Sequence, residues 1–468
     1  MSFRPAFCRW ILLAAACLSG GAARADALPP PTELPGTLTL DDALHIFRTR
    51  GLELLIAEAA VKSAEGAVKV AGAVPNPVVG GTWGYAFTYT PHDPSCEFTG
   101  ASLNATNYVE CNRDVWSVSV SDSAALEDTL SGKRDLRFKV ARTALAAAKM
   151  SRVDAERTLA FQVESAYLQV AQAVLAYKFA KEVADSNTTI LDKFQVKYAT
   201  GAINDGDLAR METQKAESDQ ALDTAAQTVR QSRIALAFLL GVRGEVPDFD
   251  VDTKVLDYAE PAALQGVTEV GLLRTAFDHR PDVIAAGYNE ASAEAALALV
   301  KRQKFPDVTL SLTYAQGGFA GSGTNAALQS PMFTFGVSMP LPVFYQLQGE
   351  QKQAEAQVDT NSLQHAMTVK QVVSDVDTAY AAFVGAQKLV MRMEKGEPGS
   401  RVRPILVSAK TALDITRLQY EKGAASLSDF LLALQTYIAT KVEYFGDLTS
   451  YWTAIYQLEE ALAVEVHR

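Results

Sequence analysis

The chain has 468 residues, with 43 Lys or Arg against 54 Asp or Glu, and its formal net charge at pH 7 is −11. This acidic balance excludes nucleic acid as an expected partner, because nucleic-acid-binding proteins need a basic surface. The five histidines are scattered, and the sequence contains no HExxH, GxSxG or P-loop motif. We therefore expect neither an enzyme nor a protein-borne metal or cofactor site.

The first segment predicts export from the cytoplasm. Arg4 and Arg9 precede an apolar run over residues 10–17, and Ala23-Arg24-Ala25 is a small-x-small cleavage site. Residues 1–25 are therefore expected to form a secretory signal peptide.

The mature chain is expected to begin at Asp26, which leaves 40 basic against 54 acidic residues and a net charge of −14. A second interpretation treats residues 14–17 as a lipobox with a lipidated Cys17. Cys96 and Cys111 are the two cysteines that remain, and in an oxidising compartment they most simply form a disulfide. A metal pair is the alternative, although two thiolates alone cannot complete a tetrahedral site.

Long spans without proline predict long helices. No proline occurs in residues 96–246, in residues 343–397 or after Pro404. Within the first span, apolar residues recur every seven residues, and a second apolar stripe is interrupted at Lys181 and Thr188. The first stripe comprises Val163, Val170, Tyr177, Ala184, Leu191 and Tyr198, and the second comprises Tyr167 and Val174. This spacing predicts helices packed on helices as in a coiled coil; an ordinary buried helix face is the alternative.

A turn motif occurs twice between such helical spans. Tyr198-Ala199-Thr200-Gly201-Ala202, followed by Asp207, reappears 222 residues later as Tyr420-Glu421-Lys422-Gly423-Ala424, followed by Asp429. A glycine where the chain must reverse is typical of the turn of a helical hairpin. The repetition predicts a duplicated structural unit.

Four segments alternate between apolar and small or hydroxyl residues, at 82–89, 116–121, 308–314 and 333–339. Alternation of this kind is typical of membrane strands with one apolar and one wet face, although a half-buried soluble sheet would alternate too. No mature segment has 18 or more consecutive apolar residues, so no transmembrane helix is expected. Four strands cannot close a barrel, and open edges are not tolerated in lipid. Several chains are therefore expected to share one barrel.

The chain resembles the TolC-type outer-membrane efflux protein family, because several short motifs of that family occur along it in the same order. The resemblance depends on residues 38–44, Val74-Pro75-Asn76-Pro77, Gly132-Lys133-Arg134, Arg280-Pro281-Asp282-Val283, Phe305-Pro306-Asp307 and the two turns. It implies a mainly α fold with β: a long helical coiled-coil tunnel, continued by a transmembrane β-barrel that a homotrimer completes with four strands per chain. The implied surroundings are outer-membrane lipid, with the helices in the periplasm.

The same resemblance divides the chain into two structural repeats. The first is expected at residues 26–245, a linker at 246–265 and the second repeat at 266–468. Each repeat would contain a helix, two membrane strands and a long helical hairpin, with hairpin tips near residues 198–207 and 420–429.

The resemblance also assigns roles to residues at the two turns. The tips that would dock on a periplasmic adaptor protein are Gly201, Ala202, Gly423 and Ala424. The periplasmic entrance or gate would be formed by Asp207, Tyr420 and Asp429. Ala425 and Leu432 depart from the family pattern at positions where a gate arginine and a second acidic ring can occur. A purely structural alternative is that the two aspartates cap helices.

The resulting hypothesis is an exit duct that passively conducts substrate from an inner-membrane pump, of the RND type, through the adaptor to the outside. The substrate would be metal cations or drugs, and Val74-Pro75-Asn76-Pro77 favours metal cations slightly. The alternatives are an exit duct for type I secretion and a periplasmic coiled-coil scaffold.

Overall fold

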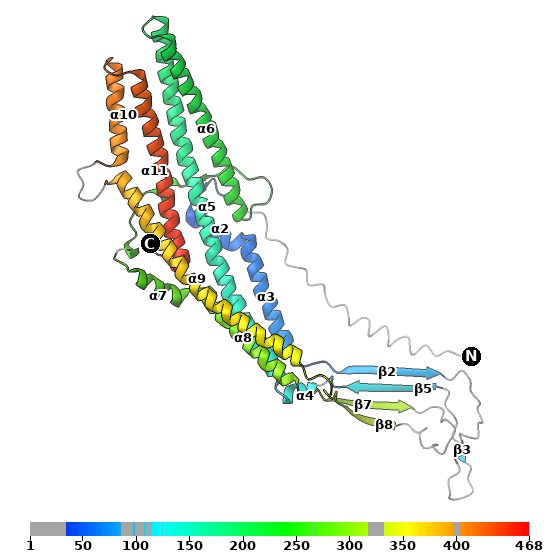
Figure 1. The fold of residues 1–468 in the computed structure, drawn as a ribbon. Coiled ribbons are helices and arrows are strands. Elements are labelled where there is room, and N and C mark those ends of the chain that lie inside the picture. Colours follow the sequence, from blue (N-terminus) through cyan, green and yellow to red (C-terminus); the bar gives the residue numbers. More distant parts are fainter. Residues whose placement is uncertain are drawn as a thin grey trace, which may run out of the picture.

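The computed structural model describes residues 34–85, 97–98, 107–108, 114–123, 125–264, 266–316, 332–396 and 403–467. Long helices run from two hairpins at one end of the molecule to a sheet at the other (Figure 1). The expected signal peptide, Cys17 and the Cys96 and Cys111 pair lie outside the described residues.

The elements of the two halves follow each other in the same order. The first half contains β1 (Thr37–Leu38), α2 (Leu40–Arg50), α3 (Leu52–Gly72), β2 (Val78–Tyr85), β3 (Glu97–Phe98), β4 (Asn107–Tyr108), β5 (Asp114–Ser121), α4 (Ala125–Leu130), α5 (Lys133–Ala199) and α6 (Asp205–Leu239). Between the halves lie β6 (Asp250–Val251), η2 (Thr253–Leu256) and η3 (Ala262–Leu264). The second half contains α7 (Glu269–His279), α8 (Pro281–Gln303), β7 (Thr309–Gln316), β8 (Met332–Ser338), α9 (Gln348–Glu394), α10 (Ile405–Glu421) and α11 (Leu427–Leu462).

Matching lengths confirm the internal duplication. Helices α2 and α7 have 11 residues each, and α3 and α8 have 21 and 23. Strands β2 and β7 have eight residues each, and α6 and α11 have 35 and 36. One difference lies in the longest helix: the 67-residue α5 is continuous, whereas its counterpart is divided into α9 and α10.

The main core lies where the helices of both halves meet the segment between them. Tyr167 of α5 is fully buried, and its hydroxyl donates to the Leu38 carbonyl at 2.8 Å and accepts from the Asp252 amide at 3.0 Å. Tyr451 of α11 is also fully buried and donates to the Ala259 carbonyl at 2.8 Å. The short parallel pair β1 and β6 lies beside this core. The two tyrosines therefore attach the connecting segment to both repeats.

The predicted helical stripe is correct in its first half and wrong at its end. Val163, Val170 and Ala184 are buried, but Tyr198 is 43 % exposed. Further along α5, Asn187 and Phe194 are buried instead. An α-helix has 3.6 rather than 3.5 residues per turn, so a strict seven-residue stripe rotates away from the packing face over several turns.

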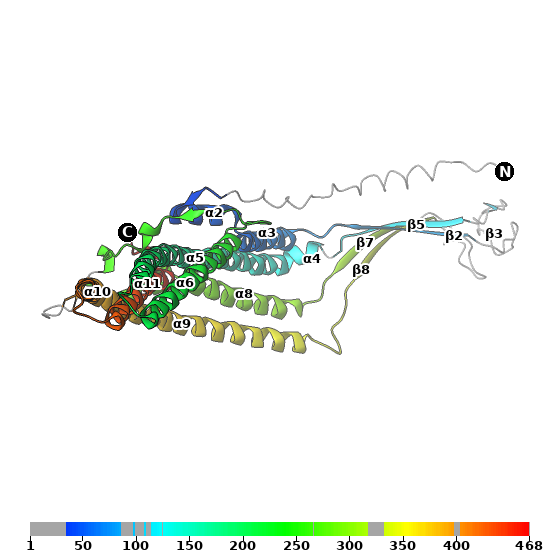
Figure 2. The same cartoon turned by 90° about the horizontal axis from the view of Figure 1, so that it is seen from above.

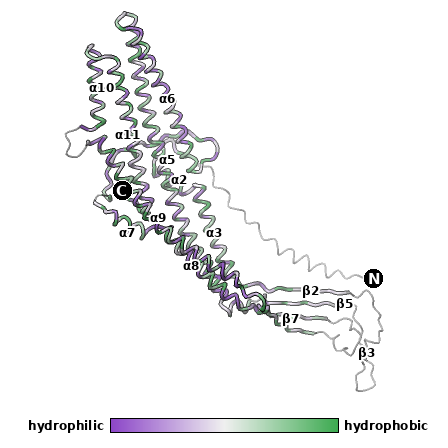
Figure 3. The backbone as a smooth tube through the Cα atoms, viewed as in Figure 1, coloured by the Kyte–Doolittle hydropathy of each residue, from purple (hydrophilic) through white to green (hydrophobic). Residues whose placement is uncertain are grey.

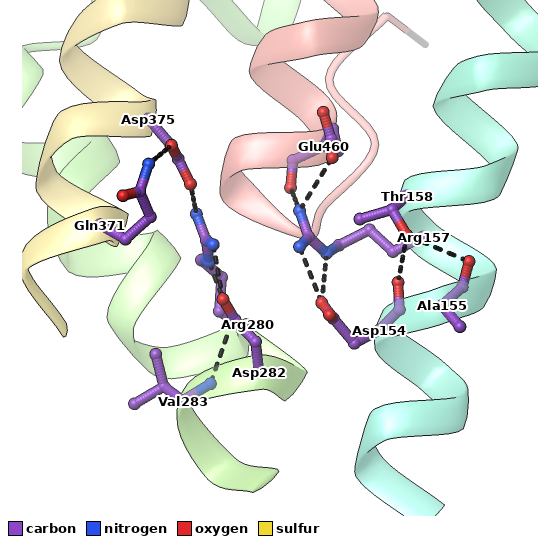
Figure 4. A network of polar contacts seen from close by, with 10 residues as sticks. All are labelled: Asp154, Ala155, Arg157, Thr158, Arg280, Asp282, Val283, Gln371, Asp375 and Glu460. Atoms are coloured by element: carbon purple, nitrogen blue, oxygen red, sulfur yellow. Dashed lines mark hydrogen bonds and ion pairs between the residues drawn. The ribbon is translucent and has the colours of Figure 1, made fainter. Parts of the chain in front are cut away.

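Figure 4 shows two clusters of polar contacts: one links the start of α8 to α9, and the other links α5 to α11. Arg280, which is 3 % exposed, donates to Asp282 at 2.6 and 3.0 Å and to Asp375 at 2.8 Å. Burial disfavours the charge of Arg280, but these bonds outweigh it and raise the pKa of the guanidinium. Arg157 pairs with Asp154 and donates to the Glu460 carbonyl. The Arg280-Pro281-Asp282 motif therefore begins α8 with Pro281 at its first position and links that helix to α9.

The sheet has the order β2-β5-β7-β8, and all its neighbouring pairs are antiparallel. The strands extend beyond the helices as a thin layer when seen from above (Figure 2). The first strand begins at Val78, four residues before its predicted start, and the predicted end of this strand lies outside the described residues. Among the described helices, none combines the length and the apolar character needed to cross a membrane.

Glu164 of α5 provides a test by pH. Burial and the negative charge of Glu459 raise its pKa from 4.5 to about 8. The folded state therefore favours the protonated carboxyl, and this contribution to stability is complete below pH 4.5 and is lost as the pH rises toward 8. Over that range Glu164 lowers the free energy of unfolding by at most about 1.4 kcal/mol per pH unit. Glu164→Gln cannot titrate, so this dependence on pH should disappear in the variant. Thermal unfolding at pH 5 and pH 8 should show the variant less sensitive to pH than the unmodified protein; equal sensitivity would contradict the assignment.

Candidate functional site

The two hairpin turns have the same backbone geometry. Gly201 and Gly423 have φ angles of +73° and +75°, in the left-handed region that glycine favours. In the first turn the Ala202 amide donates to the Lys197 carbonyl at 2.8 Å, and in the second the Ala424 amide donates to the Gln419 carbonyl at 2.8 Å. These are the six-to-one bonds of Schellman motifs, so the repeated sequence produces repeated turns.

The tips are small and exposed. Gly201, Ala202, Gly423 and Ala424 are all exposed, and a Cβ added to either glycine would meet nothing within 4 Å. A partner's backbone could therefore approach both turns closely. The docking role of these four residues stays a prediction.

Asp207 and Asp429, which each lie six residues after the turn glycine, differ in their contacts. One carboxylate oxygen of Asp429 accepts from the Ser426 hydroxyl at 2.7 Å and from the Ser426 amide at 3.1 Å, which completes a capping box at the start of α11. The Ser426 hydroxyl is the main cause that lowers the pKa of Asp429. In α6 the cap is Asn204, and the Asp207 carboxylate lies 3.5 Å from Arg210 instead. The capping alternative therefore describes the side chain of Asp429 but not that of Asp207.

An aromatic column joins the two hairpins below their tips. The Tyr420 ring lies between Phe194 and Phe430, with centroid distances of 5.9 and 5.7 Å and nearly parallel planes. The Lys197 ammonium lies 5.5 Å from the Tyr420 centroid. Burial, followed by the negative charge of Asp207, raises the pKa of Tyr420. Of the predicted entrance residues, Asp207 is therefore near enough for its charge to act on Tyr420.

Sequence reasoning missed Phe194, Lys197 and Arg210. Arg210 also lies 3.5 Å from the Ser428 hydroxyl, so it connects α6 to α11. A signal for Arg210 was present, because a cation three residues after Asp207 lies beside it on a helix. Phe194 and Lys197 could not be found in this way, since their partner Tyr420 belongs to the other repeat.

The sheet has one apolar and one hydroxyl face, as its pairing register shows. Val79, Val120, Leu312 and Phe335 lie opposite one another across the four strands. The next row, on the other face, contains Gly80, Ser119, Thr313 and Thr334. Phe335 and Phe333 are 68 % and 71 % exposed, so nothing among the described residues covers this part of the apolar face. Along the helices, in contrast, hydrophobic and hydrophilic residues follow each other without long uniform stretches (Figure 3).

No cluster of three or more His, Cys, Asp or Glu side chains that could hold a metal ion occurs in the part of the chain that the structure describes. The entrance residues Asp207 and Asp429 are instead engaged with Arg210 and Ser426.

Comparisons with known proteins agree with this architecture. The chain is 23 % identical over 408 residues to the pyoverdine export outer membrane protein OpmQ of Pseudomonas aeruginosa, covering 87 % of this chain and 81 % of that protein. It is 23 % identical over 433 residues to the cobalt-zinc-cadmium resistance protein CzcC of Cupriavidus metallidurans, covering 92 % and 91 %. The solved structure of the Campylobacter jejuni CmeC outer membrane channel has the same fold, with a TM-score of 0.69 at 16 % identity over 92 % of this chain and 86 % of that one. The outer membrane efflux protein model matches residues 44–242 and 272–464, and the chain belongs to that family.

Proposed function

We propose that three copies of this chain form one exit duct across the outer membrane, fed from the periplasm by an adaptor and an inner-membrane pump. The observation that supports this most is a sheet that is open at both edges and apolar on one exposed face. Within the described residues β2 pairs only with β5, and β8 only with β7. Unpaired edges and an apolar face are stable in lipid only when further strands close the sheet into a barrel.

The helices support ring closure because they leave two matching edges. Helices α6 and α3 continue the β2 edge, whereas α10 and α9 continue the β8 edge (Figure 1). Both edges expose large apolar side chains: Ile56, Val70 and Phe238 on the first, and Leu363, Met367 and Leu418 on the second. Joining one edge to the other is a head-to-tail contact, and such contacts form closed rings when the rotation fits.

The hairpin tips are the proposed contact with the adaptor, and Asp207, Tyr420 and Asp429 the proposed entrance. The exposed glycines and alanines of the two turns support the first assignment. The proximity of Tyr420 to Asp207 supports the second. Since the relatives include one named for metal resistance and one named for pyoverdine export, we propose metal cations or small organic compounds as substrate, with an RND-type pump as partner.

Two alternative functions, a periplasmic scaffold and an exit duct for type I secretion, have less support from this structure. A periplasmic scaffold would have to bury the apolar face that includes Phe333 and Phe335, which are largely exposed within one chain. An exit duct for type I secretion would share the barrel and differ in the pump.

Native mass spectrometry of the protein extracted from outer membranes tests the assembly. Three chains per particle are expected, and the mass of a released chain distinguishes a start at Asp26 from a lipidated Cys17. Deletion of the gene should also sensitise cells to the pump's substrate. A single chain that stays soluble without detergent would overturn the duct.

A further inference from the structure

We propose that residues 463–467 form a hook that holds the base of α11, fastened at weakly acidic pH and loosened toward alkaline pH by the carboxyl groups of Glu164 and Glu459. All the contacts of the hook lie within one chain, so this device is independent of the proposed assembly. Helix α11 carries Asp429 of the proposed entrance near its other end. The hook therefore sets how firmly the base of that helix is held.

The hook reverses the chain where α11 ends. Ala463 has a φ angle of +55°, in the left-handed region that is uncommon for a residue with a Cβ. A strained residue of this kind persists only where surrounding contacts hold it. Here Val466 is only 8 % exposed, and the His467 ring packs edge-on against the Tyr456 ring with 5.4 Å between their centroids. The residues after the reversal therefore hold the chain against α11.

Glu459 of α11 fastens the hook. Its side chain is 9 % exposed, and one of its carboxylate oxygens accepts three hydrogen bonds. The donors are the Val466 amide at 2.5 Å, the His467 amide at 2.6 Å and Nδ1 of His467 at 2.6 Å. Three donors that converge on one oxygen suit an ionised carboxylate better than a neutral carboxyl group. The hook is therefore fastened by a negative charge.

Glu164 of α5 makes this fastening sensitive to pH. Burial, followed by the negative charge of Glu459, raises the pKa of Glu164 to about 8. Glu465 of the hook acts in the same direction, whereas His467 and Arg48 oppose it. Protonated Glu164 is therefore compatible with the charged Glu459 beside it, and ionised Glu164 is not.

The surrounding charges do not remove this conflict. Arg48 of α2 is 52 % exposed and pairs with Glu156 at 3.1 Å, and Asp41 of the same helix adds a negative charge that acts on Tyr456. Opening of the hook lets water reach both carboxyl groups and relieves their repulsion. The protonated carboxyl of Glu164 thus favours the closed hook, fully below pH 4.5, and this contribution is lost as the pH rises toward 8.

Hydrogen–deuterium exchange of the intact protein in detergent tests the hook. Protection of the Val466 and His467 amides, corrected for the intrinsic exchange rate, should fall by about tenfold or more between pH 5 and pH 8. The Asp252 amide, which donates to the Tyr167 hydroxyl at 3.0 Å, is the internal control and should keep its protection.

Three variants separate the contributions. Glu164→Gln cannot ionise and should keep the hook protected at pH 8. Glu459→Gln keeps the shape of the side chain but removes the charge, so it should lower the protection at both pH values. Ala463→Gly is the matched control, because glycine suits the left-handed backbone, and it should retain the pH dependence of the unmodified protein.

Equal protection of the hook at pH 5 and pH 8 in the unmodified protein would overturn the proposal, and this measurement needs no variant. A pH dependence that persisted in Glu164→Gln would assign the effect to His467 and would overturn it as well. Simultaneous loss of protection at Asp252 would mean that the whole core loosens, which also contradicts a local hook. The number of chains per particle, by contrast, tests only the proposed duct.

Discussion

Gly423→Trp is expected to abolish export while the assembly remains intact. The residue is exposed at the tip of the second hairpin, and an added side chain would meet no atom of its own chain. An indole there would project outward and keep a partner's backbone from the turn. The left-handed backbone at φ +75° adds a strain of about 1–3 kcal/mol, which is confined to the turn. Substrate tolerance of cells that carry the variant measures the effect.

Gly423→Ala is the matched control, because it introduces the same backbone strain without the bulk. We expect it to retain most of the export activity, and both variants to yield trimers by native mass spectrometry. Normal tolerance in Gly423→Trp cells would remove the docking role from this tip. Equal loss in both variants would attribute the effect to the strained turn instead.

Arg280→Met is expected to give the largest loss of stability among single changes at ion pairs. It removes the guanidinium from between Asp282 and Asp375 and leaves two carboxylates without their cation. Removing one partner of a buried pair costs about 3–5 kcal/mol, and since Asp375 is 33 % exposed we expect a value near the lower end, about 3 kcal/mol. Unfolding of the purified protein in detergent, followed by circular dichroism, measures it.

Arg417→Ala serves as the control for that experiment. Arg417 pairs with Glu421 on the surface of α10, and both side chains are more than half exposed. An exposed pair of this type contributes about 0–1 kcal/mol. If both arginine variants unfolded at the same midpoint, the contacts of Arg280 with Asp282 and Asp375 in Figure 4 would have no special part in stability.

The strand positions could be predicted wherever residues alternate. In residues 116–121 valine or tryptophan alternates with serine, and the period of two places each set on its own face. The start of β2 was missed because Val78 and Val79 are followed by Gly80 and Gly81, so no alternation marks it. The turns were predictable for a similar local reason, since Gly201 and Gly423 stand where the chain must adopt a positive φ.

Contacts between distant segments could not be predicted in this way. The bond from Arg280 to Asp375 spans 95 positions, and the stack of Phe194 on Tyr420 connects the two repeats. The prediction that Tyr198 lies on the packed stripe was wrong, because the stripe rotates slightly with every turn and the rotation accumulates along a helix of 67 residues. The docking and entrance roles of the tip residues come from the family resemblance and remain predictions.

The division of one long helix in the second repeat has a mechanical consequence. Helix α5 is continuous, and each of its turns is hydrogen-bonded to the next. A bending force applied at the Gly201 tip is therefore transmitted along the whole helix. In the second repeat α9 ends at Glu394 and α10 begins at Ile405, and Lys395 pairs with Glu260 at 2.8 Å. On the other side of the same turn, α11 is one continuous helix of 36 residues from Leu427 to Leu462, and many of its residues are buried in the core. A force applied at the first tip can therefore reach the core through continuous α5, whereas at the second tip the continuous route is α11.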